Sequence, residues 1–82
     1  MPEVARFYGI VIKLYFGDHP PPHFHAVYGE YIGVFSIRDI SMIEGDLPLR
    51  AVRLVEEWCS IHQVELQQMW DRQEFWKLSG LN

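Results

Sequence analysis

An apolar run rich in β-branched and aromatic residues occupies residues 4–16. Side chains of an extended chain point alternately to opposite faces, so the even-numbered residues of 10–16 share one face and the odd-numbered residues of 11–15 share the other. The first face is entirely apolar, whereas the second carries one lysine. The run predicts a single long strand, buried on one face and partly covered on the other, that ends at Gly17-Asp18.

Two further strands are predicted at residues 23–28 and 31–37, and they form a hairpin because only Gly29-Glu30 separates them. In that register, Tyr28 faces Tyr31. One face of the hairpin carries the better set of core residues, which are Phe24, Ala26, Tyr28, Tyr31, Gly33, Phe35 and Ile37. The other face carries His23, His25, Val27, Ile32, Val34 and Ser36. The histidines are therefore expected on the more open side of the sheet.

A long helix is predicted in the last part of the chain, after a connector with a short fourth strand at residues 41–44. Asp46-Leu47-Pro48 is typical of a helix start, with Asp46 as the cap and Pro48 in the first turn. A stripe then recurs at spacings of three and four: Val52, Val55, Cys59, His62, Leu66 and Met69. This stripe predicts an amphipathic helix laid against a sheet, either continuous to about Gln73 or broken near Ser60.

These elements predict an α+β fold: a three- to four-stranded antiparallel sheet followed by a long C-terminal helix or helix pair packed on one face. Residues 1–82 are expected to form a single domain. The chain is 49% hydrophobic and 15% aromatic, and a domain of this size has a small core. Aromatic surface beyond what that core can hide favours self-association or a partner protein.

The charge and the cysteine content limit the classes of partner. A net charge of −4 does not support a dominant electrostatic contact with nucleic acid, and Arg38, Arg50 and Arg53 are the candidates for a local basic patch. A single cysteine, Cys59, excludes an internal disulfide and is expected to be a buried, inert thiol in a reducing compartment. No signal-peptide pattern opens the chain, and no apolar stretch approaches the ~18 residues of a membrane span. A cytoplasmic protein with no membrane partner is therefore expected.

Three of the four histidines lie within seven residues, beside Asp18 and a run of prolines. Two residues of strand place the Cα atoms of His23 and His25 roughly 6.5 to 7 Å apart on one face. Neutral imidazole is the commonest ligand for zinc and similar divalent ions. A third ligand could come from His19, Asp18 or Glu30. Three ligands with an open position could activate water, so the cluster predicts a metal site and, with it, hydrolytic chemistry.

The same histidines support two other interpretations. His23 and His25 could act without metal as base and acid in RNA cleavage, with Tyr28 or Arg38 assisting, although the net charge does not favour this. They could also form a hydrogen-bonded polar edge that fixes the proline run. The candidate catalytic residues are accordingly His23, His25 and Tyr28.

His62 lies on the apolar stripe of the predicted helix, where it is expected to be neutral and hydrogen-bonded. Glu65 is one turn further on and could orient it. If the helix covers the Phe24 face, His62 lies on the wrong side of the sheet to join His23 and His25. Packing over the histidine face, or a neighbouring subunit, would reunite them.

Several segments together resemble a family of small bacterial proteins of unknown function that is described by a D-H-x-P-P-H-F-H signature. The segments are Ile10-Val11-Ile12, Asp18-His19-x-Pro21-Pro22-His23-Phe24-His25, Tyr28-Gly29-Glu30-Tyr31, Gly45-x-Leu47-Pro48, Glu57-Trp58-x-x-x-His62-x-x-Glu65-Leu66 and Trp70. The retained family positions are His19, His23, His25, Tyr28, Glu30, Trp58, His62 and Glu65. The resemblance implies a co-encoded small protein as a partner, in an arrangement suspected of being a toxin–antitoxin pair. The first expectation is therefore an interaction module, and the alternatives are a divalent-metal protein or hydrolase and a metal-independent RNase.

Overall fold

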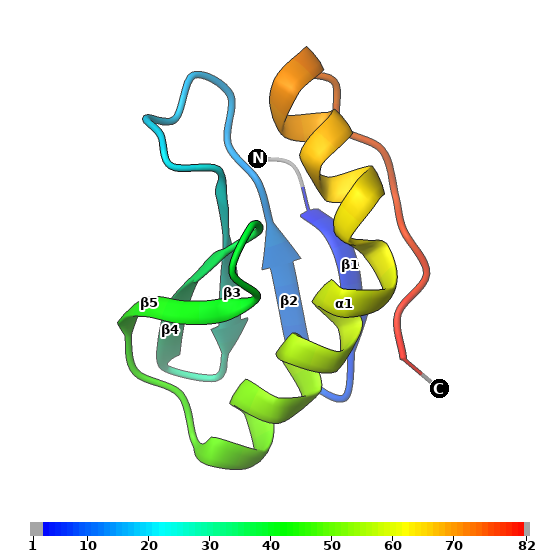
Figure 1. Cartoon of the computed structure of the whole chain (residues 1–82). Coiled ribbons are helices and arrows are strands. Elements are labelled where there is room, and N and C mark those ends of the chain that lie inside the picture. The colour runs from blue at the N-terminus through cyan, green and yellow to red at the C-terminus, as the bar shows by residue number, and fades with distance from the viewer. Residues whose placement is uncertain (1–2, 82) are drawn as a thin grey trace.

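A five-stranded antiparallel sheet followed by one long helix makes up the α+β fold of the computed structural model, which describes residues 3–81 (Figure 1). The elements are β1 (Glu3–Phe7), β2 (Ile10–Lys13), β3 (His23–Tyr28), β4 (Tyr31–Ser36), β5 (Ser41–Gly45) and α1 (Leu49–Arg72). The strands follow one another across the sheet in chain order. The predicted fold class is confirmed, but the sheet has five strands instead of three to four.

The extra strand arises because the apolar run 4–16 is a hairpin and not one strand. β1 and β2 pair in antiparallel register across a turn at Tyr8 and Gly9, whose φ angles are 49° and 80°. Positive φ at both central residues is the feature of the two-residue hairpin turn whose twist matches that of the strands. β2 ends at Lys13, and Phe16 lies outside the core with 66% of its surface exposed. The prediction of a single strand that buries Phe16 is therefore wrong.

The predicted β3–β4 hairpin is confirmed residue by residue. Tyr28 pairs with Tyr31 and His23 pairs with Ser36, and Gly29 takes a positive φ of 58° in the turn. The predicted fourth strand is β5, and it includes Gly45. Gly45 has φ 96°, and a Cβ there would overlap the carbonyl oxygen of Ile32. Glycine is therefore required where β5 approaches β4 most closely.

The helix begins two residues later than predicted and bends in its second half. Pro48 occupies the N-cap position and no side chain caps the helix, so the expected cap at Asp46 is not formed. The bend lies at His62, which has φ −109° and ψ 15°, two residues beyond the predicted break at Ser60. The left-handed residue Gln73 ends the helix at φ 55°. No helix among residues 3–81 combines the length and the apolar character that crossing a bilayer requires.

Trp58 of α1 is the centre of the core. It is fully buried, its ring stacks on Phe7 at 5.7 Å, and it meets the ring of Phe24 edge-on at 5.7 Å. Its indole N–H donates to the carbonyl oxygen of Ser79 at 2.8 Å, which ties the C-terminal segment to the helix. α1 therefore covers the sheet face that carries Phe24, as the hairpin pattern predicts. The C-terminal segment runs back beside β1, where the backbone N–H of Leu78 donates to the carbonyl oxygen of Val4 at 2.7 Å (Figure 1).

Cys59 is fully buried beside Trp58 in the core. Burial raises the pKa of its thiol to about 12, and the negative charge of Glu56 adds to this effect. The thiol is therefore protonated at neutral pH, and protonated thiols are poor nucleophiles and poor metal ligands.

Candidate metal centre

Asp18, His23 and His25 converge at the start of β3. Oδ2 of Asp18 lies 2.9 Å from Nε2 of His23 and 3.4 Å from Nε2 of His25. The three residues each offer one ligating atom, and all three atoms lie within 4.8 Å of one another. Among residues 3–81, no other three histidine, cysteine or acidic side chains bring their ligating atoms this close together.

The loop of residues 14–22 brings Asp18 back over the strand. Gly17 has a positive φ of 69°, and such a backbone turns the chain sharply at little cost when the residue is glycine. The other carboxylate oxygen of Asp18, Oδ1, accepts the backbone N–H of His19 at 3.0 Å. That bond fixes the carboxylate so that Oδ2 faces the two imidazoles.

The contacts of His23 show which of its two ring nitrogens carries a hydrogen and which one faces Asp18. Nδ1 of His23 lies 2.7 Å from the carbonyl oxygen of Pro21, and a carbonyl can only accept, so Nδ1 carries the hydrogen. Neutral His23 therefore directs the lone pair of Nε2 at the carboxylate of Asp18. Two acceptors at 2.9 Å need a proton or a cation between them, and His23 is only 6% exposed.

Aromatic rings and the end of the helix support the cluster. The ring of Tyr15 meets His25 edge-on at 4.8 Å, and Trp70 of α1 packs against His23 at 5.1 Å. The side chain of Gln73 accepts the backbone N–H of Gly17 at 2.7 Å. The end of α1 therefore holds the loop in place, a contribution that the sequence does not predict, since nothing in it links Trp70 or Gln73 to the histidines.

The carboxyl group of Asp18 is held in its charged form. Partial burial opposes its ionisation, but the hydrogen bond to His25, the positive charge that His23 carries when it is protonated and the backbone N–H of His19 together lower its pKa below the usual value. An ionised carboxylate beside two imidazoles is a donor set that binds divalent cations.

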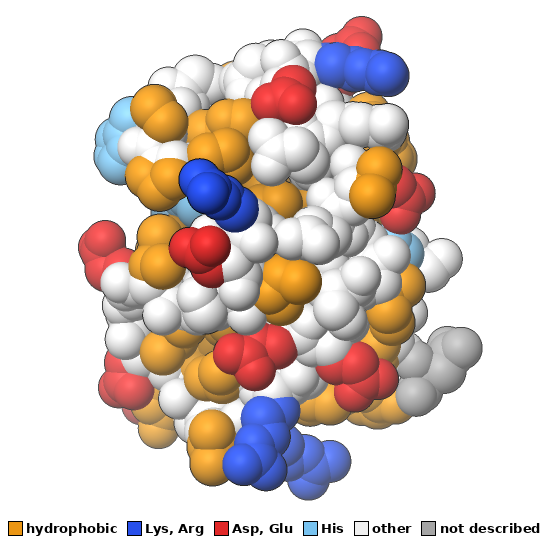
Figure 2. Space-filling view, in the orientation of Figure 1, with side chains coloured by type: hydrophobic (Ala, Val, Ile, Leu, Met, Phe, Trp, Pro, Cys, Tyr) orange, Lys and Arg blue, Asp and Glu red, His pale blue; other side chains and the backbone are white. Residues whose placement is uncertain are grey.

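Three other candidate residues, from the same part of the chain, lie outside the cluster. His19 is exposed and packs on the ring of His23 at 5.8 Å, but its Nδ1 faces the carbonyl of Pro20. Histidine side chains reach the surface at this edge of the molecule (Figure 2). Tyr28 and Glu30 lie at and beyond the far end of β3, so neither supplies the third ligand or an acid–base partner to this cluster.

His62 and Glu65 form a separate pair on α1. Nδ1 of His62 lies 2.8 Å from Oε1 of Glu65, and the imidazole packs against Trp58 at 5.2 Å. His62 does not join His23 and His25, because α1 reaches His23 through Trp70, about two turns beyond His62. The bend in α1 lies at His62 itself, so the contact with Glu65 fixes the side chain of the residue at which the helix bends.

The chain matches no curated protein and no solved structure. A family model matches residues 9–71, from the β1–β2 turn to the last turn of α1. The match includes Asp18, His23 and His25. Because it covers most of the sequence, the chain belongs to the DUF4160 family, a domain of unknown function.

Proposed function

We propose that this protein binds a divalent transition-metal ion through Asp18, His23 and His25, and that the centre supports hydrolytic chemistry. The observation that carries the proposal is the hydrogen bond from Nδ1 of His23 to the carbonyl of Pro21. Histidines that bind metals almost always donate their second ring N–H to a carbonyl or carboxylate, which fixes the ring and leaves the other nitrogen for the metal.

The separations of the donor atoms fit a small cation. Bonds of about 2.0–2.1 Å in a tetrahedral arrangement place the ligating atoms about 3.3–3.4 Å apart. The distance from Asp18 to His25 is 3.4 Å and that from Asp18 to His23 is 2.9 Å. All three ligating atoms lie within 4.8 Å of one another, so small rotations of these side chains bring them to the spacing that the ion requires.

Three protein ligands leave at least one coordination position open, as in catalytic zinc sites and unlike closed structural sites. The side chains of Asp18 and His25 are 21% and 24% exposed, so water can reach this position. Two histidines and one carboxylate suit zinc, iron(II) and manganese. A bound ion of this kind lowers the pKa of a coordinated water, which is what hydrolysis at neutral pH requires.

The test is elemental analysis of untagged protein purified without chelators. We expect close to one metal ion per chain in the wild type and a loss of at least about 90% in His23→Ala/His25→Ala, because removing two ligands costs far more than the 10–100-fold affinity loss of a second-shell change. His62→Gln is the matched control, since it removes a histidine outside the cluster, and it should keep the metal.

His19→Ala should also keep the metal, because His19 is exposed and its Nδ1 faces the carbonyl of Pro20 and not Asp18. Wild-type protein that holds no metal after exposure to zinc, manganese and iron(II) would overturn the proposal. In that case RNA cleavage in the presence of EDTA, abolished by His25→Ala, would favour the metal-independent ribonuclease instead.

An interaction module that acts with a co-encoded small protein, as in a toxin–antitoxin pair, is the second candidate. The observation that favours it is the exposure of apolar side chains on α1, where Ile61 and Val64 both face solvent. In the view over the helix, such side chains lie among charged ones (Figure 2). Co-purification with the neighbouring gene product that Val64→Glu abolishes would support this function, and co-purification that survives the substitution would count against this surface.

A further inference from the structure

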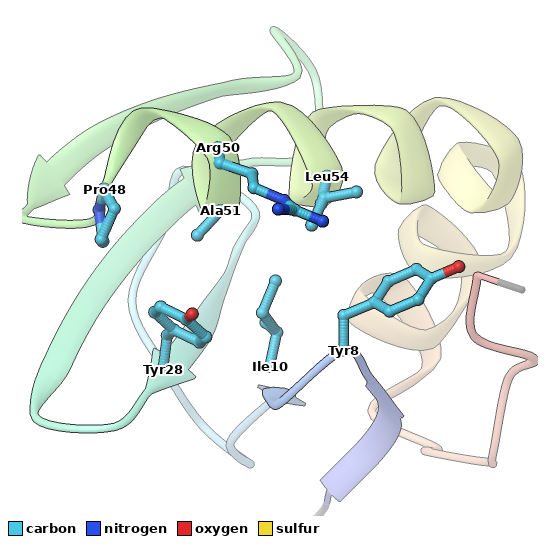
Figure 3. A pocket seen from close by; sticks show the side chains of 7 residues that line it. All are labelled: Tyr8, Ile10, Tyr28, Pro48, Arg50, Ala51 and Leu54. Carbon is cyan, nitrogen blue, oxygen red and sulfur yellow. The ribbon is translucent and has the colours of Figure 1, made fainter.

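A second concave site lies at the opposite end of β3 from the metal centre (Figure 3). Its volume is about 480 Å³, within the range of small-molecule sites. The residues that line it are Tyr8, Ile10, Tyr28, Pro48, Arg50, Ala51 and Leu54. The first turns of α1 form one wall, and the β1–β2 turn with the end of β3 forms the other (Figure 3).

The interior of this pocket is apolar with an aromatic ring at either end. Ile10 and Ala51 face each other across it and are buried in the core (Figure 3). Tyr28 lies on one side of Ile10 and Tyr8 on the other (Figure 3). The ring of Tyr28 is steadied by a stacked ring, that of Tyr31, at 6.5 Å. This lining suits a flat apolar group.

Arg50 is the one charged residue in the lining. Its side chain extends along the pocket beneath α1 (Figure 3), and among residues 3–81 it forms no ion pair. The first turn of α1 contains no acidic residue and no side chain caps it. An unpaired guanidinium beside uncapped backbone N–H groups is a local positive charge in a chain of net charge −4. The ligand should therefore carry a negative group.

Tyr8 adopts a backbone conformation that is unfavourable for a tyrosine. Its φ is 49°, and the first position of this turn is normally filled by asparagine, aspartate or glycine. The core does not compensate for this strain, since Tyr8 is 53% exposed. Strained residues of this kind are concentrated at binding sites, where the side chain is needed.

We propose that this pocket binds a small aromatic carboxylate. The aromatic ring of the ligand lies between Tyr8 and Tyr28, with Ile10 on one side and Ala51 on the other. Its carboxylate pairs with the guanidinium of Arg50. Arginine binds carboxylates through two parallel hydrogen bonds, which would also orient the ring. This site shares no residue with the metal centre, so it stands or falls independently of the proposed function.

The test is an NMR titration of the ¹⁵N-labelled full chain with 3-phenylpropionate. We expect shifts of the Ile10 and Ala51 amides with a dissociation constant on the order of 1 mM or lower, as befits so small a ligand. 3-Phenylpropanol lacks the charge and propionate lacks the ring, so each should bind at least about tenfold more weakly. No shift of these amides up to about 10 mM, or equal binding of either control compound, would overturn the proposal.

Two variants separate binding from folding. Arg50→Gln should weaken 3-phenylpropionate about tenfold without changing Tm, because it removes the charged contact from an exposed position. Tyr8→Asn should weaken binding because it removes the ring. It should also raise Tm by a few degrees, because asparagine tolerates the positive φ and each kcal/mol gained shifts the Tm of a small domain by about 4–8 °C. A lower Tm in Tyr8→Asn would show that Tyr8 stabilises the fold. Unchanged binding would show that Tyr8 does not contact the ligand, and either result would count against the proposal.

Discussion

Zinc at about 100 times its dissociation constant is expected to raise the Tm of the wild-type protein by on the order of 10–20 °C. A ligand that binds only the folded state at this excess contributes about 2.7 kcal/mol, and each kcal/mol shifts Tm by about 4–8 °C in a domain of this size. The site is assembled only when the loop of residues 14–22 lies over β3, so the unfolded chain cannot present the same three ligands together.

The matched variant for this experiment is Asp18→Asn/His25→Gln, which puts a neutral polar side chain at each position and removes the carboxylate and one imidazole. In EDTA its Tm should lie close to that of the wild type, and zinc should move it by less than about a third of the wild-type shift, because one ligand cannot hold the ion. Scanning calorimetry measures the Tm shift that zinc causes. Equal shifts in the variant and the wild type would show that zinc binds elsewhere on the chain.

Trp58→Ala is expected to destabilise the protein by about 3–5 kcal/mol, the usual cost of emptying a fully buried tryptophan site. Trp58 packs on Phe7 of β1 and Phe24 of β3 and bonds to Ser79, so the cavity would open where sheet, helix and C-terminal segment meet. A domain of this size buries little surface, so its stability should lie near the lower end of the usual range of about 5–15 kcal/mol, and the substitution should remove most of it.

Urea denaturation followed by far-ultraviolet circular dichroism measures this loss without depending on tryptophan fluorescence. Trp58→Phe keeps most of the ring volume but leaves the Ser79 carbonyl without its donor, and it should cost an intermediate amount of about 1–3 kcal/mol. Trp76→Ala is the control, since Trp76 is partly exposed and its loss should cost less than about 1 kcal/mol. A Trp58→Ala variant within about 1 kcal/mol of the wild type would show that another residue is the centre of the core.

The β3–β4 hairpin could be predicted to the residue because two constraints agree. Gly29-Glu30 leaves room only for a two-residue turn, and the alternation on either side then fixes which side chains meet. The β1–β2 turn gave no such signal. Tyr8 is a bulky β-former at a position that usually selects asparagine or glycine, and a lone glycine within an apolar run is ambiguous.

The candidate site divides in the same way between local and distant contributions. Asp18, His23 and His25 are close in sequence, so strand alternation was enough to pair the two histidines, and Asp18 was one of three candidates for the third ligand. The contact of Trp70 with His23 depends on how far α1 reaches along the sheet and where it bends. Helix placement follows from the packing of many side chains and is not encoded in any short motif, which is why this contact could not be foreseen.

The order of the strands across the sheet has a consequence for how the chain reaches its structure. Each strand pairs with the one just before it along the chain, so the sheet forms by closing only short loops. Proteins dominated by such local contacts fold quickly. During synthesis the whole sheet, with the loop that carries Asp18, can pair before α1 has left the ribosome. Asp18, His23 and His25, the proposed metal ligands, would then be brought together before the core is closed, and Trp70 of α1 would pack against His23 last.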